Sequence, residues 1–352
     1  MVYDALMLKR ILMLTLGFSA LTGHAESERP TARIFDKTQL ISFDFTRLRV
    51  QKERLLDGGT LPDSIMTLVF PEVLPVAAER TLQDDDFVVG VSINGDTRAY
   101  PVKILNWHHG VNDLLGSVPV YVSWDALAGA GLAFNRLVEG QELIFGHTGL
   151  VYQGAGILYD RTHHSLWSPL VGEAISGDFS GGKLSYLPVF MTRWKMFKQS
   201  FPDGTVLNTQ TGYSRPYDVH PISPTFARDT KLVFPTKYYG DELPRKELVY
   251  GVELTRGKDK VAVAFKLSEL VNYGSGRYEF RFGKERIPLA IEPMKPSGRI
   301  KLLAPPEVDI KAHYAYWYAW SAHHPHGLVI KNFSHAKHAG EEIVNTKQLV
   351  QF

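Results

Sequence analysis

The chain has 352 residues, no cysteine, and a formal net charge of +2 at pH 7. The near-neutral charge disfavours a nucleic-acid-binding protein, and the lack of cysteine excludes disulfides, thiolate catalysis, cysteine-ligated metals and a lipoprotein anchor. An apolar fraction of 44% with 22% charged residues is typical of a soluble globular protein.

The N-terminus carries a predicted secretory signal peptide. Lys9 and Arg10 precede an apolar run over residues 11–21, which ends in small residues at Gly23 and Ala25. Because this run is shorter than the roughly 20 residues that a membrane span needs, a cleavable signal is favoured over a membrane anchor. We therefore expect an exported protein, periplasmic or secreted, whose mature chain has no membrane span.

Short strands joined by turns are predicted after the signal. Residues 87–93 and 98–100 alternate as strands do, and Asn94-Gly95 between them is a strong hairpin signal. The stretch 97–136 then predicts a strand, a short apolar helix after Pro101 and a second strand after Pro119. Three further short strands have the spacing of a meander, over residues 142–146, 149–152 and 156–160.

A short helix with an aromatic face ends this part of the chain. Trp194, Phe197 and Phe201 recur at helical spacing within residues 192–201. After a polar connector the pattern starts again, and residues 317–327 resemble 194–204 in their aromatic spacing and in the Pro-x-Gly that follows. Two degenerate tandem copies are one interpretation, and chance similarity between generic hairpins is the other.

These observations predict a β-rich α+β fold of antiparallel meanders and hairpins with short helices. The two-copy hypothesis divides the chain into a signal peptide, an N-terminal arm, a first copy with the candidate site, a connector, a second copy that serves as scaffold and a polar tail. The predicted boundaries are 1–25, 26–83, 84–207, 208–245, 246–331 and 332–352.

The first copy resembles the family catalogued as domain of unknown function 3179. The segments that carry the resemblance are Arg98-Ala99-Tyr100-Pro101, Ile104-Leu105-Asn106-Trp107-His108, Val111-Asn112-Asp113, Phe134-Asn135-Arg136, Leu158-Tyr159-Asp160-Arg161, Ser165-Leu166-Trp167-Ser168, Gly172-Glu173-Ala174 and Thr211-Gly212-Tyr213-Ser214-Arg215. The resemblance covers about residues 65–330 and implies no assigned activity. Family members commonly carry Cys-Pro-Leu-Cys-Gly where this chain has Asp125-Ala126-Leu127-Ala128-Gly129, and usually Glu where His109 stands. Thiol chemistry at this place is therefore excluded here.

A polar and aromatic corner is the predicted ligand-binding site. Its predicted ligand-binding residues are Asn106, Trp107, Asp160, Arg161, Trp167 and Arg215. Arg161 or Arg215 is suited to bind a carboxylate or a phosphate. The structural alternative is a buried ion pair between Asp160 and Arg161 that orients the turn leading to Trp167.

A divalent metal ion is the cofactor hypothesis for the same corner. His108 or His109, with Asp125 and Asp160, offers ligands suited to zinc or manganese. A structural histidine under Trp107 and an aspartate that caps the next turn are the alternatives. A secondary, weaker metal site is predicted at His323, His324 and His326, which belong to a histidine-rich C-terminal stretch.

The leading functional hypothesis is an exported ligand- or metal-binding accessory module whose partner is a small ligand or an envelope protein. A metal-dependent hydrolase or oxidoreductase that uses His108, Asp125 and Asp160 is the enzymatic alternative. A structural subunit of an envelope complex is the third, and it predicts an exposed apolar patch. No catalytic residue is assigned from the sequence.

Overall fold

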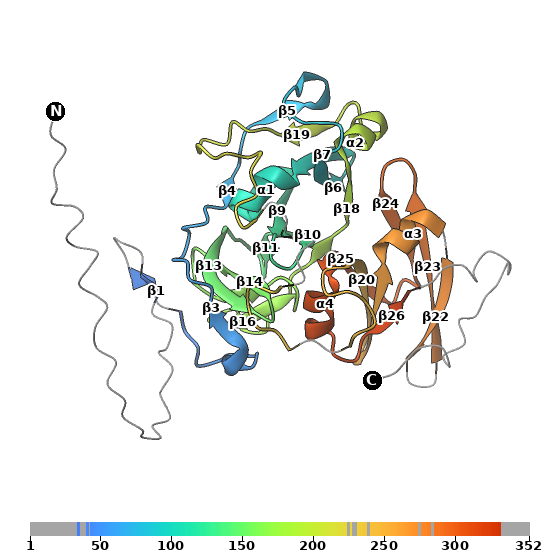
Figure 1. The fold of residues 1–352 in the computed structure, drawn as a ribbon. Helices are drawn as coiled ribbons and strands as arrows, with labels where there is room; N and C mark the ends of the chain where they lie inside the picture. Colours follow the sequence, from blue (N-terminus) through green and yellow to red (C-terminus); the bar gives the residue numbers. More distant parts are fainter. Residues whose placement is uncertain are drawn as a thin grey trace. The chain divides into compact units, whose positions relative to one another are not determined.

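The fold is taken from a computed structural model, which describes residues 34–35, 40–41, 43–223, 226, 231–237, 240–273, 276–282 and 285–331. All of these residues belong to one compact unit of the chain, Ile34–Phe352, and Figure 1 shows their strands and helices. The predicted signal peptide and the predicted polar tail therefore lie outside the described residues.

The described residues form a β-rich α+β fold with mostly antiparallel sheets, as predicted. The largest sheet has nine strands. Its continuous path runs through β26 (Leu328–Ile330), β21 (Asp259–Lys266), β20 (Leu248–Arg256), β25 (Asp309–Tyr316), β10 (Ala130–Asn135), β9 (Val118–Asp125), β8 (Gly110–Leu115) and β4 (Leu68–Val69). Off this path, β17 (Tyr186–Leu187) pairs with β10. This sheet joins the two predicted copies through the pairing of β10 with β25.

Two five-stranded sheets belong to the first predicted copy and the arm before it. One contains β16 (Glu173–Ser176), β15 (Leu166–Ser168), β14 (Ala155–Asp160), β13 (Phe145–Tyr152) and β3 (Leu55–Asp57), in this order. The other contains β18 (Val189–Arg193), β6 (Phe87–Ile93), β7 (Asp96–Pro101), β19 (Thr205–Leu207) and β5 (Val73–Pro75).

Three small sheets complete the described strands. Their members are β22 (Gly276–Phe282), β23 (Glu285–Met294) and β24 (Arg299–Leu303), then β11 (Leu137–Val138) with β12 (Gln141–Glu142), and β1 (Ile34–Phe35) with β2 (Leu40–Ile41).

Four short α-helices of seven residues each directly follow a strand in the described chain (Figure 1). They are α1 (Val102–His108), α2 (Trp194–Ser200), α3 (Leu267–Tyr273) and α4 (Trp317–His323), and two 3-10 turns are η1 (Lys52–Arg54) and η2 (Val76–Ala78). The predicted aromatic helix is confirmed as α2, in which Trp194 and Phe197 are buried. None of the described helices is both long and apolar enough to cross a bilayer.

The predicted Asn94-Gly95 hairpin is confirmed between β6 and β7. Ile93 pairs with Asp96, so the turn has two central residues. Asn94 and Gly95 have φ angles of 51° and 93°, and positive φ at both central residues is the requirement of the turn that matches the twist of a hairpin.

The two predicted copies have the same strand order. β18, β6, β7 and β19 form one series and β25, β20, β21 and β26 the other, and in both the last strand runs parallel to its neighbour. α1 and α3 follow the third strand of each series, and α2 and α4 follow the first. The two-copy hypothesis predicts this correspondence; the duplication and its boundaries stay proposals.

One apolar cluster contains residues from both predicted copies. Phe134, Phe145 and Trp167 belong to the same cluster of buried side chains as Trp317 and Trp320. Burial of such large aromatic rings is a main source of stability. The two predicted copies therefore contribute buried side chains to the same cluster.

Candidate functional site

A cavity of about 360 Å³ lies where the ends of α1 and β9 approach β13 and β14. Its volume is within the range of small-molecule sites. Its lining combines imidazole, carboxylate and guanidinium groups with an apolar wall, and consists of Gly58, Thr60, Ser64, Ile65, Asn106, Trp107, His109, Asp125, Leu127, His147, Gly149, Val151, Gly156, Arg215, Pro221, Ile222, Val233 and Phe234. A recess of about 20 Å³ shares four of these residues, His109, Asp125, His147 and Gly156.

His109 enters the cavity from the end of α1. It caps the helix in the left-handed conformation, with φ 56° and ψ −9°, and its N–H donates to Leu105 O. Non-glycine residues are uncommon in this conformation and are often found at functional positions. Among the described residues, no hydrogen bond to either ring nitrogen of His109 is found. The side chain of His109 lines the cavity.

His147 enters from β13, where the pairing with β14 shifts register between His147 and Val151. Bulges of this kind re-aim side chains and are frequent beside functional sites. The side chain is 6% exposed, and burial together with the nearby His109 lowers the pKa of His147 to about 3. The ring is therefore neutral at pH 7. Its Nδ1 accepts from Gly149 N–H at 3.2 Å, which assigns the proton to Nε2.

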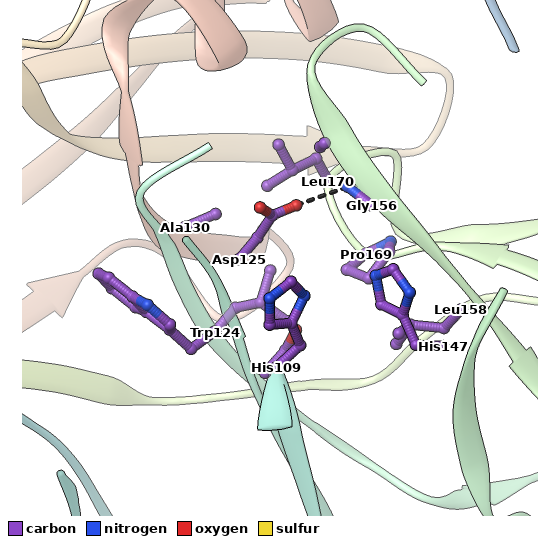
Figure 2. A pocket seen from close by; sticks show the side chains of 12 residues that line it. His109, Trp124, Asp125, Ala130, His147, Gly156, Leu158, Pro169 and Leu170 are labelled. Carbon is purple, nitrogen blue, oxygen red and sulfur yellow. Dashed lines mark hydrogen bonds between the residues drawn. The ribbon is translucent and has the colours of Figure 1, made fainter. Parts of the chain in front are cut away.

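Asp125 ends β9 and anchors the floor of the cavity. Its Oδ1 accepts from the N–H groups of Leu127 and Ala128 at 2.8 and 3.1 Å, so it caps the following turn as the structural alternative predicted. Its Oδ2 accepts from Gly156 N–H at 2.5 Å, which ties β9 to β14 (Figure 2). The carboxylate is thus held by three backbone donors.

The two imidazoles and the carboxylate converge on the recess. The rings of His109 and His147 lie edge to face with centroids 5.0 Å apart, and Figure 2 shows Asp125, Pro169 and Leu170 around them. Burial lowers the pKa of His109, and the charge of Asp125 partly opposes this effect. A recess of this size holds about one water molecule.

This arrangement offers both hydrogen-bonding roles to a ligand. Neutral His147 donates from Nε2, and His109 can donate or accept according to its tautomer. Asp125 contributes a fixed negative charge whose oxygens are already engaged. Within the part of the chain that the structure describes, no three His, Asp or Glu side chains group closely enough to hold a metal ion.

Five predicted site residues line the cavity: Asn106, Trp107, His109, Asp125 and Arg215. The Oδ1 of Asn106 accepts from Trp124 Nε1 at 2.8 Å, and Trp107 Nε1 donates to Val219 O at 3.0 Å. Arg215 is exposed. These five residues therefore border one cavity, whereas the other predicted site residues do not line it.

His108 does not line the cavity, which corrects the prediction of a metal ligand there. The side chain is 1% exposed, and both ring nitrogens are engaged, Nδ1 with Met66 O at 2.8 Å and Nε2 with Tyr217 Oη at 2.7 Å. Since α1 ends at His108, adjacent histidines point to different surroundings. His108 therefore has the structural role that was the alternative.

Asp160 and Trp167 lie in the core and not in the cavity. Asp160 is fully buried and accepts from His163 N–H at 2.6 Å, Ser165 N–H at 3.1 Å and Trp167 Nε1 at 3.0 Å. It therefore organises its own turn. It is not a ligand for a metal shared with Asp125.

The predicted ion pair between Asp160 and Arg161 is wrong. Arg161 pairs instead with Asp63, at 3.0 Å between Nη2 and Oδ2. The same Asp63 oxygen accepts from Tyr159 Oη at 2.6 Å, so this aspartate joins the arm to β14. With its charge engaged away from the cavity, Arg161 does not serve as the predicted anion-binding group there.

The C-terminal histidines do not converge. His323 directs Nδ1 to Ala319 O at 2.8 Å and packs its ring against Tyr152. His324 stacks on Trp320 and directs Nε2 to Glu253 Oε2 at 3.3 Å. His326 is exposed. The secondary metal site predicted at these three residues is therefore not formed by the described geometry.

The sequence interpretation missed His147 and Gly156. A Cβ at Gly156 would lie 2.8 Å from His147 Nε2 and 3.4 Å from Asp125 Oδ2, so only glycine leaves this approach open. A glycine inside a strand often marks such a close approach. The position of Gly156 in the predicted strand 156–160 is therefore the sequence signal that points to this approach.

The comparison with known proteins identifies the family. No curated protein and no solved structure matches the chain. A family model matches residues 62–302, which is more than half of the chain and includes the cavity residues His109, Asp125 and His147. The match agrees with the resemblance noted in the sequence, and the chain belongs to the family described as Protein of unknown function (DUF3179).

Proposed function

We propose that this protein binds a small organic ligand in the cavity between α1, β9, β13 and β14. The observation that carries the proposal is His147, a buried neutral imidazole whose Nε2–H faces a space that Gly156 keeps open. Buried polar groups normally have partners, and a donor held beside a cavity is suited to a ligand's acceptor.

The lining suggests the chemistry of the ligand. Asp125 disfavours an anionic group beside the recess, so an uncharged acceptor such as a carbonyl oxygen suits His147. An apolar body fits the wall formed by Ile65, Val151 and Phe234, and Arg215 lies on the lining to receive an anionic end. We therefore propose a carbonyl compound with an apolar body and a carboxylate or similar group.

A pair of glycine substitutions tests the proposal. Gly156→Ala places a methyl group against His147 Nε2, whereas Gly131→Ala, a buried control outside the cavity, adds only ordinary contacts at 3.5 Å or more. Fragment-sized ketones and amides that carry a carboxylate, with matched amines for comparison, would be screened by ligand-observed NMR. We expect binding to the parent protein and to Gly131→Ala, and loss of binding in Gly156→Ala.

Two results would contradict the binding proposal. One is that no carbonyl compound binds the parent protein, and the other is that Gly156→Ala binds as well as Gly131→Ala. Preference for the matched amines would overturn the proposed ligand chemistry, because a cation would then be drawn to Asp125.

Export is part of the same proposal, supported by Lys9, Arg10 and the apolar run over 11–21. N-terminal sequencing of the protein recovered from the periplasm or medium of a bacterial host tests it. A chain that begins near Glu26 is expected, and an uncleaved chain retained in the cytoplasm would contradict export.

A structural subunit of an envelope complex is the second candidate. Val69, Phe70, Leu114 and Leu137 are between 40% and 54% exposed, and they lie in or beside β4, β8 and β11. Exposed apolar side chains on neighbouring elements are the feature that this alternative requires. Co-purification of an envelope protein that is lost in Phe70→Ser would support this candidate.

A further inference from the structure

Strand pairing aligns the two predicted copies residue by residue. One row of paired residues in the first copy consists of Phe190, Gly90, Ala99 and Val206. The corresponding row in the second copy consists of His313, Gly251, Ala264 and Val329. In both copies the helix that follows begins with tryptophan four residues after the first member of the row. His313 therefore occupies the position of Phe190.

The residues just after the two helices also correspond. Phe201 and His324 follow α2 and α4, with φ and ψ of −137° and 61° against −128° and 68°. Each donates its N–H to the residue four positions earlier, which is Phe197 in one copy and Trp320 in the other. His324 therefore occupies the position of Phe201.

The first copy fills these positions with phenylalanine. Phe190, Phe197 and Phe201 pack against one another with ring centroids 5.1 to 6.1 Å apart. The second copy fills the same positions with His313, Trp320 and His324. Since the fold accommodates an apolar set, the backbone alone does not require the polar set of the second copy.

A buried carboxylate, that of Glu253, pairs with His324 of the second copy. Glu253 is 7% exposed and pairs with Lys260 at 2.5 Å, with His324 at 3.3 Å and with Lys311 at 3.5 Å. Burial alone would raise the pKa of Glu253, but the hydrogen bond from His324 and the lysine charges hold this pKa well below its usual range. Buried ion pairs are weak sources of stability, so this cluster calls for another explanation.

Both ring nitrogens of His324 are engaged. Nδ1 contacts Trp320 O at 3.0 Å and Nε2 contacts Glu253 Oε2 at 3.3 Å. His324 therefore links the Glu253 carboxylate to the backbone of α4 through its two ring nitrogens.

Lys311 connects this cluster to the recess. Its Nζ donates to Val171 O at 2.8 Å and lies 4.8 Å from the centroid of the Tyr186 ring, whose hydroxyl donates to Pro169 O. Pro169 and Leu170 line the recess beside His109 and His147. Gly172 leaves room for the ammonium group, because a Cβ there would meet Nζ at 2.1 Å. The segment 169–172 is thus held from the second copy.

We propose that Glu253, His324 and Lys311 are positioning residues for the recess: Glu253, held by His324, orients the Lys311 ammonium on Val171 O, and Lys311 fixes the segment 169–172 against His109 and His147. The significance of this role rests on the proposed function, since the recess adjoins the proposed binding cavity. The contacts themselves do not depend on a ligand.

Hydrogen exchange measures the proposed constraint directly. Gly172 N–H donates to Ser168 O at 2.8 Å inside the segment. In Lys311→Met we expect exchange of the Gly172 amide to accelerate by about tenfold or more, because local opening becomes easier there. The amides of the β6–β7 hairpin should keep their rates. The imidazole NMR signals of His109 and His147 should shift in the same variant.

Lys260→Met is the matched control, because Lys260 also pairs with Glu253 but has no hydrogen bond to the segment 169–172 among the described residues. It should leave the exchange of Gly172 and the imidazole signals unchanged. If Lys311→Met does not fold, Glu253→Gln preserves the side-chain shape and is expected to accelerate Gly172 in the same way.

Two results overturn the positioning role. One is unchanged exchange of Gly172 in Lys311→Met, and the other is equal acceleration in the β6–β7 hairpin, which would indicate general destabilisation. The outcome is separable from that of the binding proposal. If Gly172 exchange accelerates locally but the parent protein binds no carbonyl compound, the positioning role is retained and the proposed function is rejected. If the parent protein binds a carbonyl compound but Gly172 exchange is unchanged in Lys311→Met, the proposed function is retained and the positioning role is rejected.

Discussion

Asp125 and Asp160 stand at the starts of two similar turns, one beside the cavity and one in the core. Each ends a β-strand, and each carboxylate accepts three hydrogen bonds, from three backbone N–H groups at Asp125 and from two N–H groups and an indole at Asp160. Asp160 is fully buried, whereas Asp125 is partly exposed and lines the cavity.

The difference between the turns lies in what faces them. The Asp160 turn packs under Trp167, which contacts Phe145 and Phe179. Asp125 lies across Gly156 from His147, whose ring contacts the ring of His109. Hydrogen bonding of an aspartate to its own turn therefore does not distinguish a structural turn from one at a candidate site. The side chains that face the turn make this distinction, and they come from strands that are distant in the sequence.

The largest expected effect is that of Asp160→Ala. Removal of this buried carboxylate leaves three donors without their acceptor, two of them in buried hydrogen bonds, at about 1–3 kcal/mol for each buried donor. Because the losses are not fully additive, we expect the free energy of unfolding to fall by about 3–5 kcal/mol, measured by urea denaturation. Asp160→Asn retains one acceptor oxygen and should lose less. A loss below about 1 kcal/mol in Asp160→Ala would contradict the structural role.

Asp125→Ala should have a smaller effect on stability and a distinct effect on titration. Water in the cavity can replace the lost acceptor, so we expect a loss of about 1–2 kcal/mol. Since the charge of Asp125 raises the pKa of His109, its removal should lower that pKa further. NMR titration of the His109 ring measures this shift. Asp125→Asn, which removes the charge and keeps an acceptor, should reproduce the shift with less destabilisation; an unchanged His109 titration would contradict the coupling.

The smallest expected effect is the contribution of His147 to the pH dependence of the free energy of unfolding. The pKa of His147 is about 3 in the folded protein and about 6.5 in the unfolded chain. The unfolded state therefore binds the proton first on acidification. The stability that His147 contributes is present above pH 6.5 and is lost as the pH falls from 6.5 towards 3.

The expected loss from His147 is about 1 kcal/mol between pH 6.5 and 5.5, because the slope reaches its limit of about 1.4 kcal/mol per pH unit only at lower pH. Urea unfolding at pH 6.5 and 5.5 would compare the parent protein with His147→Gln, in which this contribution is absent. The difference in slope isolates His147 from the other histidines. Equal slopes in the two proteins would show that His147 accepts a proton in the folded state.

Local patterns predicted the local structure of this chain. Asn94-Gly95 sets its hairpin through the φ angles of two residues, and the aromatic face of α2 follows from helical spacing. The capping role of Asp125 was recognised as an alternative because its partners, Leu127 and Ala128, are two and three residues away. Interactions within a few residues are readable from such patterns.

The parts of the site that sequence patterns did not predict depend on long-range contacts. Arg161 was assigned to its neighbour Asp160, but its partner Asp63 belongs to the N-terminal arm. His147 reaches the cavity through a register shift between β13 and β14, which no local pattern specifies. The sequence leaves the metal ligand open between His108 and His109, because only the cap geometry at the end of α1 separates the surroundings of the two histidines.

The left-handed helix cap at His109 has a consequence for engineering and for natural variation. Glycine adopts this backbone conformation without the steric penalty of a side chain, which is about 1 kcal/mol for most residues. Selection for thermal stability alone would therefore favour His109→Gly. This substitution would remove the cavity imidazole for which no hydrogen bond is found among the described residues. At this position, selection for thermal stability and the proposed ligand recognition favour different residues.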